Sequence, residues 1–343
     1  MKRRIWTALV GLAAVVALVA VPSALAAYTS TKLEVQQSGT KLVAKISANP
    51  SDDPTARAIV LVPSGTQLTT SQAPGTVLGS VQAGATVLAL GGANVQLTGK
   101  IVVVAPGQVP ASQSAPCLQG ATPLATWFMA LQAVGQTINF PLYLVSTAGG
   151  PFAAVSPAYV LVCLPAPDTP EALASTNPAA TAKLYSATLS ISGVFSAVPL
   201  GVWISIWTPY TPKTGQPNAA GTIAAPAAVA PGAVSASAKK RDLGAIVSGK
   251  VTQAGQGRGS ATVTIRGGAK PSALRKVGSV KAKANGAFDF RARRGTFFKV
   301  TAVAASIAAP QLCSAISSQL QGLPCVNPTA NGFTAQSKTV KKK

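Results

Sequence analysis

The sequence predicts an all-β protein of two sandwich-like domains that follow a cleaved signal peptide. Short runs rich in apolar and β-branched residues recur between Gly, Pro, Ser and Asn, a pattern typical of antiparallel sandwiches. Helical periodicity is nearly absent along the chain. Of the 343 residues, 48% are hydrophobic and 10% are charged, so the chain has enough apolar side chains to build a core.

The N-terminus has the layout of a secretory signal peptide. Lys2, Arg3 and Arg4 precede an apolar run over 5–21, and small residues at 24–26 follow Pro22. We expect cleavage after Ala26 and a mature protein that is secreted, either extracellular or associated with the cell surface, and that does not span the membrane. The alternative is an uncleaved anchor, since the apolar run is nearly long enough to cross a bilayer.

The larger domain is expected over residues 27–212. Alternation of apolar and polar residues around a short turn predicts a first hairpin, with strands at 31–36 and 41–46. Further strands are expected at 58–62, 76–81, 100–105, 138–145, 158–164, 184–192 and 202–207. Short helices at 124–134 and 171–174 are the expected exceptions.

A second domain is expected after a segment of different composition. Residues 213–238 are rich in Ala, Pro and Gly, which suits a linker or an edge strand. The domain that follows, 239–343, ends in a Lys tail. Its strands are expected at 245–252, 260–266, 277–283, 287–291, 296–303 and near 333–340.

Three segments of the second domain carry a resemblance to a known family. The runs 247–251 (VSGKV), 261–265 (ATVTI) and 285–290 (NGAFDF), with the strand around Phe298, resemble carboxypeptidase regulatory-like domains. The resemblance implies an immunoglobulin- or prealbumin-like β-sandwich that serves as an accessory module and has no catalytic residues of its own. Residues 309–327 depart from the pattern as an insertion.

The larger domain carries a second, shorter likeness. It is similar to uncharacterised secreted bacterial proteins that share a Trp-Thr-Pro-Tyr segment, here residues 207–210. That likeness implies no function.

The four cysteines fit an exported protein. Cys117 and Cys163 lie in the first half, and Cys313 and Cys325 lie near the end. Pairing within each half is the simplest of the three possible connectivities, and we expect disulfides rather than free thiols. Neither pair has the spacing of a metal site, and the chain has no His to complete one, so no metal and no other cofactor is expected.

Positive charge is concentrated in the second half of the chain. Residues 27–212 hold six Lys or Arg and five Asp or Glu. Residues 213–343 hold 20 Lys or Arg and only two Asp or Glu. A hairpin through Asn285 and Gly286 would place four cations on one solvated sheet face, and Arg258, Arg266, the run 239–241 and the tail 341–343 add to the same field. The expected polyanion-binding residues are Lys281, Lys283, Arg291, Arg293, Arg266 and Arg258.

This charge distribution predicts a partner of opposite sign. Outside the cell, that partner is an anionic envelope polymer or the headgroups of an anionic membrane, bound in a salt-dependent way. The alternative is that the lysines serve only to keep an acid-poor protein soluble. Sequence-specific nucleic-acid binding is not expected, because no recognition helix or RNA-binding motif is present.

Enzymatic activity is not expected. The absence of His removes His-dependent triads and the commonest general base. The alternative is an exported hydrolase that uses a Ser/Lys nucleophile, since Ser38 and Lys41 match Ser-x-x-Lys and are followed by 175–177 (STN) and 213–215 (KTG). However, Ser38 falls at the predicted hairpin turn, whereas that chemistry needs a helix there. The function that remains is a non-catalytic exported structural or binding protein.

Overall fold

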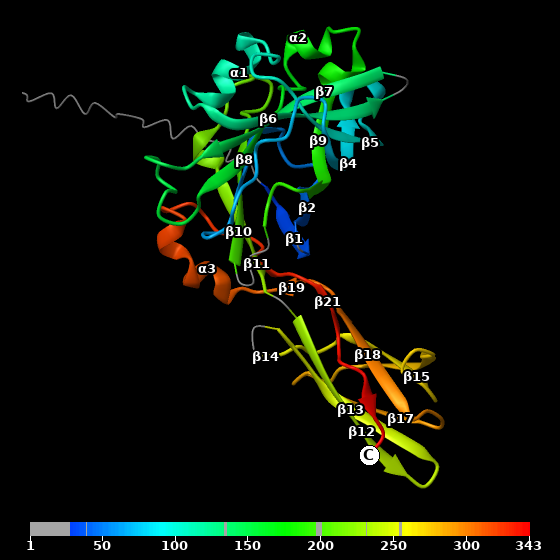
Figure 1. Cartoon of the computed structure of the whole chain (residues 1–343). Coiled ribbons are helices and arrows are strands. Elements are labelled where there is room, and N and C mark those ends of the chain that lie inside the picture. The colour runs from blue at the N-terminus through cyan, green and yellow to red at the C-terminus, as the bar shows by residue number, and fades with distance from the viewer. Residues whose placement is uncertain (1–27, 39, 134–135, 197–200, 231, 254–255) are drawn as a thin grey trace, which may run out of the picture.

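The protein has two β-rich lobes, which confirms the all-β prediction (Figure 1). The structure, a computed structural model, describes residues 28–38, 40–133, 136–196, 201–230, 232–253 and 256–343. The expected signal peptide and its cleavage site lie outside these residues. Within them, every helix is too short or too polar to cross a membrane.

The large lobe is built on a continuous 13-stranded sheet instead of the two packed sheets expected. Every neighbouring pair is antiparallel except β11 and β20, which are parallel. In spatial order its strands are β1 (Lys32–Ser38), β2 (Lys41–Ser47), β9 (Ala182–Ser192), β4 (Val77–Val87), β5 (Ala93–Val103), β6 (Pro123–Ala133), β7 (Gln136–Ser146), β8 (Ala158–Cys163), β3 (Thr55–Leu61), β10 (Gly201–Pro209), β11 (Ile223–Val229), β20 (Thr329–Ala330) and β19 (Ile307–Ala308).

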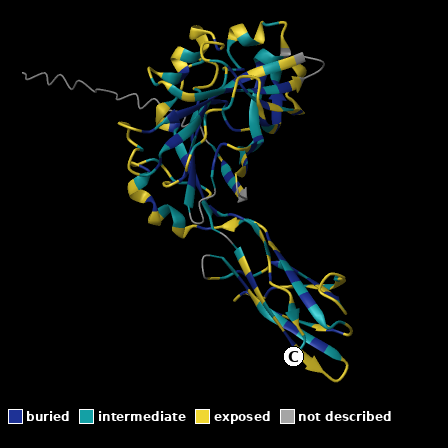
Figure 2. Ribbon diagram, in the orientation of Figure 1, coloured by how far each residue is buried: buried dark blue, intermediate teal, exposed yellow. Residues whose placement is uncertain are grey.

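The sheet curls until its first strand lies against its far end. The Thr329 hydroxyl in β20 donates to the Leu33 carbonyl in β1 (2.8 Å), and the Asn327 side chain donates to the Thr31 carbonyl (2.9 Å). The inner face carries the main core, which includes the fully buried Trp127. Buried residues therefore follow the strands of the large lobe in Figure 2.

The outer face of the same sheet carries a second core, which lies beneath the short helices α1 (Ala111–Leu118) and α3 (Gln311–Ala315). Ile59 of β3 and Tyr143 of β7 belong to this core with Cys117, Ile316 and Leu320. The helices of the large lobe are α1 (Ala111–Leu118), α2 (Pro170–Leu173) and α3 (Gln311–Ala315), with single turns η1 (Leu88–Leu90), η2 (Pro178–Thr181), η3 (Ala219–Gly221) and η4 (Ser317–Gln319).

The expected hairpin at 31–36 and 41–46 is confirmed as β1 and β2, and the expected helix at 171–174 is confirmed as α2. The helix expected at 124–134 is wrong, because most of this segment is strand β6. It pairs with β5 and β7 and buries Trp127, Met129 and Leu131, which share one face of a strand. Here pairing with neighbours overrides the helix-forming residues of the segment.

The small lobe consists of two sheets packed around one core. The four-stranded sheet contains β12 (Gly232–Arg241), β13 (Gly244–Gln253), β14 (Gln256–Gly257) and β17 (Ala287–Ala292). The five-stranded sheet contains β15 (Thr262–Gly268), β16 (Arg275–Lys281), β18 (Phe297–Ala304), β21 (Phe333–Gln336) and β22 (Val340–Lys341). Val247 and Phe288 from the first sheet pack with Val263, Phe298 and Val300 from the second.

The boundary between the lobes differs from the expected one. Residues 213–238, expected as a linker, form η3, β11 in the large sheet and most of β12 at the edge of the four-stranded sheet. The chain also returns from β18 of the small lobe to the large lobe, where it forms β19, α3 and β20 before it comes back as β21. The insertion at 309–327 thus belongs to the large lobe.

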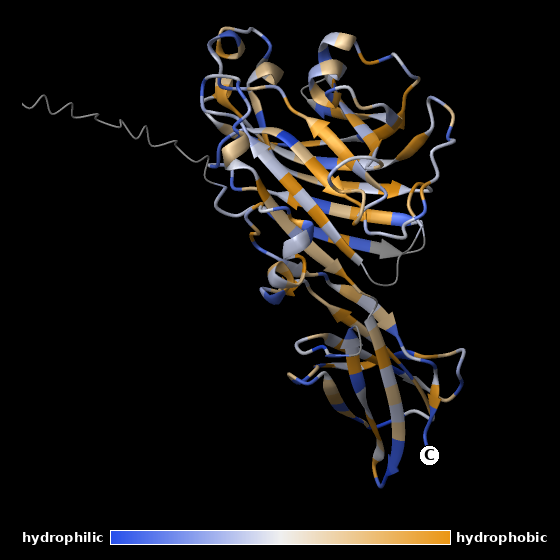
Figure 3. Ribbon diagram, turned by 90° about the vertical axis from the view of Figure 1, so that its left-hand side faces the viewer, coloured by the Kyte–Doolittle hydropathy of each residue, from blue (hydrophilic) through white to orange (hydrophobic). Residues whose placement is uncertain are grey.

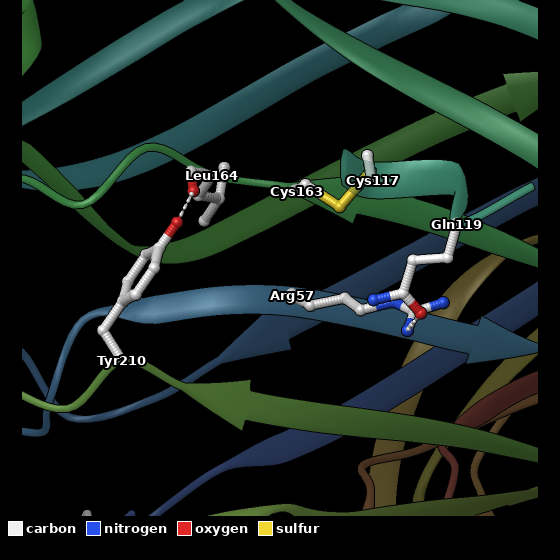
Figure 4. The surroundings of a disulfide bond; sticks show 6 residues. All are labelled: Arg57, Cys117, Gln119, Cys163, Leu164 and Tyr210. Atoms are coloured by element: carbon white, nitrogen blue, oxygen red, sulfur yellow. Dashed lines mark hydrogen bonds between the residues drawn. A yellow bond between two sulfur atoms is a disulfide. The ribbon is translucent and has the colours of Figure 1, made fainter. Parts of the chain in front are cut away.

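Both expected disulfides are confirmed. Cys117 of α1 is bonded to Cys163 of β8, and Cys313 of α3 is bonded to Cys325, with Cα–Cα distances of 5.8 Å in both cases. The first ties α1 to the outer face of the large sheet (Figure 4). The second closes the returning segment onto itself.

Candidate anion-binding surface

The surface starts from the hairpin of β12 and β13, which forms the end of the small lobe farthest from the large lobe (Figure 1). Arg241 and Gly244 face each other across a turn of two residues, Asp242 and Leu243. Gly244 has a φ of 127°, and a Cβ there would lie 2.1 Å from the Ala292 carbonyl, so the turn requires glycine. We call this end of the small lobe the basic end.

Two strands place cations on the outer face of the four-stranded sheet, on either side of Ile246 in the central strand. Val234 and Ala238 of β12 point into the core, so Lys239 points to solvent. Lys239 faces Ile246 of β13, which in turn faces Arg291 of β17. Next to them is a cavity of about 360 Å³ lined by Arg241, Asp242, Leu243, Ala245, Ile246, Arg291, Ala292 and Arg293.

The five-stranded sheet has a row of like charges at the same end. Lys276 of β16 faces Arg266 of β15, which faces Lys299 of β18 on its other side. Directly opposed like charges on a sheet destabilise it. No ion pair among the described residues offsets this row. An anion that bridged the three side chains would relieve the repulsion.

The C-terminal lysines join the two sheets at this end. The Lys342 amide donates to the Thr296 carbonyl beside the five-stranded sheet (2.8 Å), and the Lys240 amide of β12 donates to the Lys343 carbonyl (2.7 Å). The tail therefore lies along the lobe instead of projecting from it, and its charges add to those of both sheets.

Together these elements concentrate charge at the basic end. Of the 20 Lys and Arg residues from 213 onward, 14 lie in this half of the small lobe, whereas Asp242 is the acidic residue that the described structure places there. Figure 3 shows hydrophilic segments at this tip. The 14 cations are Lys239, Lys240, Arg241, Arg266, Lys270, Arg275, Lys276, Arg291, Arg293, Arg294, Lys299, Lys341, Lys342 and Lys343.

The structure separates the residues that the sequence grouped on one face. Arg291 and Arg293 lie at the basic end, but Lys281 lies at the opposite end of the other sheet, where its ammonium donates to the Thr262 hydroxyl (2.7 Å). Lys283 forms an ion pair with Asp289 (2.9 Å). The expected pairing of the strands around Asn285 is thus wrong.

The physical reason lies in the turn itself. β16 pairs with β15 and β17 pairs with β13, so the turn at 283–287 carries the chain from one sheet to the other. Gly286 has a φ of 80°, and a Cβ there would lie 2.1 Å from the Val251 carbonyl. The Asn-Gly turn therefore packs against β13, whereas a surface hairpin would leave it free.

Arg258 is also not part of the surface. Its residue is 6% exposed, and its guanidinium donates to the Ala305 carbonyl. Burial lowers the pKa of Arg258 from its ordinary value. This side chain holds the chain where it leaves β18 for the large lobe, so its role is structural.

The sequence did not identify the cations of the surface that are brought together by long-range strand pairing. Lys299 and Lys276 lie more than 20 residues apart in sequence, and each reaches Arg266 from a different side. The alternation of 297–303 indicates that Lys299 points outward, but no local pattern reports the register with β15.

The Ser-x-x-Lys string lies in the hairpin of β1 and β2, where Ser38 and Lys41 face each other across the turn. Asp52, in the loop that follows this hairpin, has a structural role. Asp52 is 4% exposed and accepts hydrogen bonds from the Thr29 amide and hydroxyl and from the Asn49 amide. It thus closes the loop that precedes β3.

Neither a protein-family model nor a curated protein sequence matches this chain. Among solved structures, the chain is similar to "Crystal structure of dimeric latent PorU from Porphyromonas gingivalis", at 10% identity and a TM-score of 0.16. The match covers 91% of this chain and 34% of that chain, so this chain spans about a third of the length of that protein. A likeness at this TM-score carries no argument about fold or function.

Proposed function

We propose that this is an exported, non-catalytic binding protein whose basic end attaches to an anionic surface outside the cell. The observation that carries the proposal is the concentration of 14 cations in one half of the small lobe, against a large lobe of nearly balanced charge. Such a cluster attracts polyanions over about 10 Å at ordinary ionic strength. Solubility alone gives no reason to place the charges at one end.

Export is supported by the layout of residues 1–26 and by the two disulfides, which persist in oxidising compartments. The candidate partners are anionic lipid headgroups and anionic envelope polymers. The carboxypeptidase regulatory-like resemblance favours a prealbumin-like accessory module, which is consistent with a binding role.

Leu243 favours the lipid surface. It lies at the tip of the β12–β13 turn, is 90% exposed and is flanked by Arg241, by Arg291 of β17 and by Arg293. An apolar side chain at the apex of a cationic surface can enter the acyl boundary while the cations contact headgroups. A soluble polyanion offers no environment of this kind for Leu243.

The test uses charge variants of the full mature chain, because a truncation between the lobes would remove strands β19 and β20 from the large sheet. One variant carries Arg266→Gln, Lys276→Gln and Lys299→Gln. Its control carries Lys213→Gln, Lys250→Gln and Lys281→Gln, which removes the same charge from exposed positions elsewhere. Binding is measured by co-sedimentation with vesicles of phosphatidylglycerol and phosphatidylcholine, and with phosphatidylcholine alone.

We expect the first variant to bind anionic vesicles about 100-fold more weakly than the control, at roughly 1 kcal/mol per cation near the surface. Binding of the wild type should fall as salt rises and should be absent on neutral vesicles. Equal retention of the two variants would overturn the basic end as the binding surface.

The variant Leu243→Ser tests whether the partner is a lipid surface or a soluble anionic polymer. It should weaken vesicle binding by roughly 10-fold, the effect of withdrawing one buried Leu, but leave binding to soluble poly(glycerol phosphate) unchanged. The control is Leu173→Ser, an exposed Leu on α2 of the large lobe. An equal loss for both ligands, or none for either, would assign the partner to the polymer class.

A serine-directed activity probe tests the alternative class. Specific labelling of Ser38 in the mature protein would overturn the non-catalytic assignment in favour of a hydrolase.

A further inference from the structure

A cleft on the outer face of the large lobe lies apart from the basic end. Its floor comes from β3, β8 and β10, and one wall is α1. Its volume is about 750 Å³, which lies in the range of small-molecule sites. Figure 4 shows part of its lining, with Arg57 and Gln119 on one side of the disulfide and Tyr210 on the other.

The cleft is rigidly built. Arg57 of β3 is paired in register with Cys163 of β8, and Cys163 is bonded to Cys117 of α1. The wall is thereby covalently fixed to the floor beside the arginine. On the other side, the Tyr210 hydroxyl donates to the Leu164 carbonyl (2.7 Å).

Among the described residues that line the cleft, one is charged, and it is Arg57. A guanidinium carries five N–H donors. In Arg57, Nη1 donates to Gln119 Oε1 at 3.4 Å, a long contact, and Nε is buried without a hydrogen-bond partner in the described structure. Nε is closed off from solvent, so a ligand in the cleft would meet the Nη groups, which have no hydrogen-bond partner in the described structure other than Gln119.

The lobe has little excess positive charge to leave a cation unpaired, since it holds seven cations and five acidic residues. Two other cations of the lobe have partners: Lys32 pairs with Glu34 (2.6 Å), and the Lys183 ammonium donates to the Asp52 carbonyl (2.7 Å). Arg57 instead faces a cleft with no carboxylate among its described lining residues.

The rest of the lining combines neutral hydrogen-bonding groups with a larger apolar surface. Hydroxyls and amides can bind sugar-like hydroxyl groups, and Pro141 supplies an apolar patch. The polar lining residues are Ser112, Gln113, Gln119, Asn139, Thr208, Tyr210 and Thr222.

We propose that this cleft binds a small hydroxylated carboxylate, such as a sugar acid, with the carboxylate on the Arg57 guanidinium. The planar guanidinium matches a carboxylate with two parallel hydrogen bonds, and an ion pair in a partly enclosed cleft gives specificity for the acid over its neutral analogue. The surrounding amides and hydroxyls then bind the hydroxyl groups.

The test uses glucuronate as the probe and glucose as its neutral counterpart. Binding to the mature protein is measured by titration calorimetry and by amide chemical shifts, with the side-chain amides of Gln119 and Asn139 as local reporters. We expect saturable binding of glucuronate, with shifts confined to the cleft, and at least 10-fold weaker binding of glucose.

Arg57→Gln should weaken glucuronate binding by about 10- to 100-fold, the effect of losing a charge-assisted pair. Arg57→Lys, which keeps the charge but loses the planar fork, should be intermediate. Lys100→Gln, an exposed cation on β5 outside the cleft, should bind as the wild type. Thermal unfolding of each variant checks that it is folded.

Equal binding of glucose and glucuronate, wild-type affinity in Arg57→Gln, or the absence of saturable glucuronate binding would each overturn this proposal. The outcome is independent of the proposed attachment, because Arg57→Gln leaves the basic end intact and should sediment with anionic vesicles as the wild type does.

Discussion

At the scale of single residues, burial raises the pKa values of three tyrosines. Tyr143 of β7 is 1% exposed, and its hydroxyl has no hydrogen-bond partner in the described structure. Burial raises the pKa of Tyr143, and burial is also the main cause of the raised pKa values of Tyr28 and Tyr210. An unfolded chain ionises its tyrosines near pH 10, so above that pH the folded state binds more protons than the unfolded state. Its stability must therefore fall as the pH rises.

Tyr143→Phe keeps the ring and removes the unpaired hydroxyl. We expect its free energy of unfolding to equal or exceed that of the wild type at neutral pH, by up to about 1 kcal/mol. Above about pH 10 it should lose less stability than the wild type, because one raised pKa is gone. Urea unfolding at both pH values measures this, and parallel losses in the two proteins would contradict the assignment.

At the scale of elements, the disulfides stabilise the short helices of the large lobe. α1 has eight residues, contains Pro116 and has no side-chain cap at its N-terminus, so its own hydrogen bonds hold it weakly. α3 is shorter still, at five residues. Each is tied covalently, α1 to β8 and α3 to the segment before β20.

Replacing both cysteines of a disulfide by Ser should destabilise the large lobe, and the two disulfides should differ in how much. Loop entropy predicts a loss of about 4 kcal/mol for Cys117–Cys163, which spans 46 residues, and about 3 kcal/mol for Cys313–Cys325, which spans 12. Urea unfolding of the two double variants gives both values. Losses below about 1 kcal/mol in both variants would show that the helices need no covalent support.

At the scale of the whole molecule, the two lobes are interwoven. The chain enters the small lobe between β11 and β12, leaves it after β18, and returns to it before β21. The returning segment buries Ile316 and Leu320 in the outer core of the large lobe, and Thr329 bonds to β1. The large lobe therefore depends on residues that come after most of the small lobe.

A chain that ends at residue 238 should therefore be unstable even though it contains every strand from β1 to β11. It would lose the partner of β11 and expose an unpaired edge and apolar surface. We expect aggregation in size-exclusion chromatography and a lowered unfolding temperature. The variant with Gln at 266, 276 and 299 keeps all strands and loses the repulsion between these cations, so it should unfold at or above the wild-type temperature. A monomeric truncated protein with wild-type thermal stability would contradict this interpretation.

Local patterns in the sequence were sufficient for several features. Alternation located the β1–β2 hairpin and the strands of the small lobe, because side-chain direction in a strand repeats every two residues. The composition of 213–343 reported its charge. The positions of the four cysteines along the chain predicted the disulfide pairing that the structure confirms. Each of these depends on residues near one another or on simple counts.

Other features required the tertiary structure. Whether 124–134 is helix or strand, which sheet β17 joins, and whether Arg258 is buried depend on neighbours far away in sequence. The same holds for the row of Lys276, Arg266 and Lys299 and for the Arg57 cleft. Strand register and sheet membership are decided by long-range packing, and an isolated segment carries no record of them. The sequence by itself thus determined the strand content and the total charge, and the tertiary structure decided where that charge meets a partner.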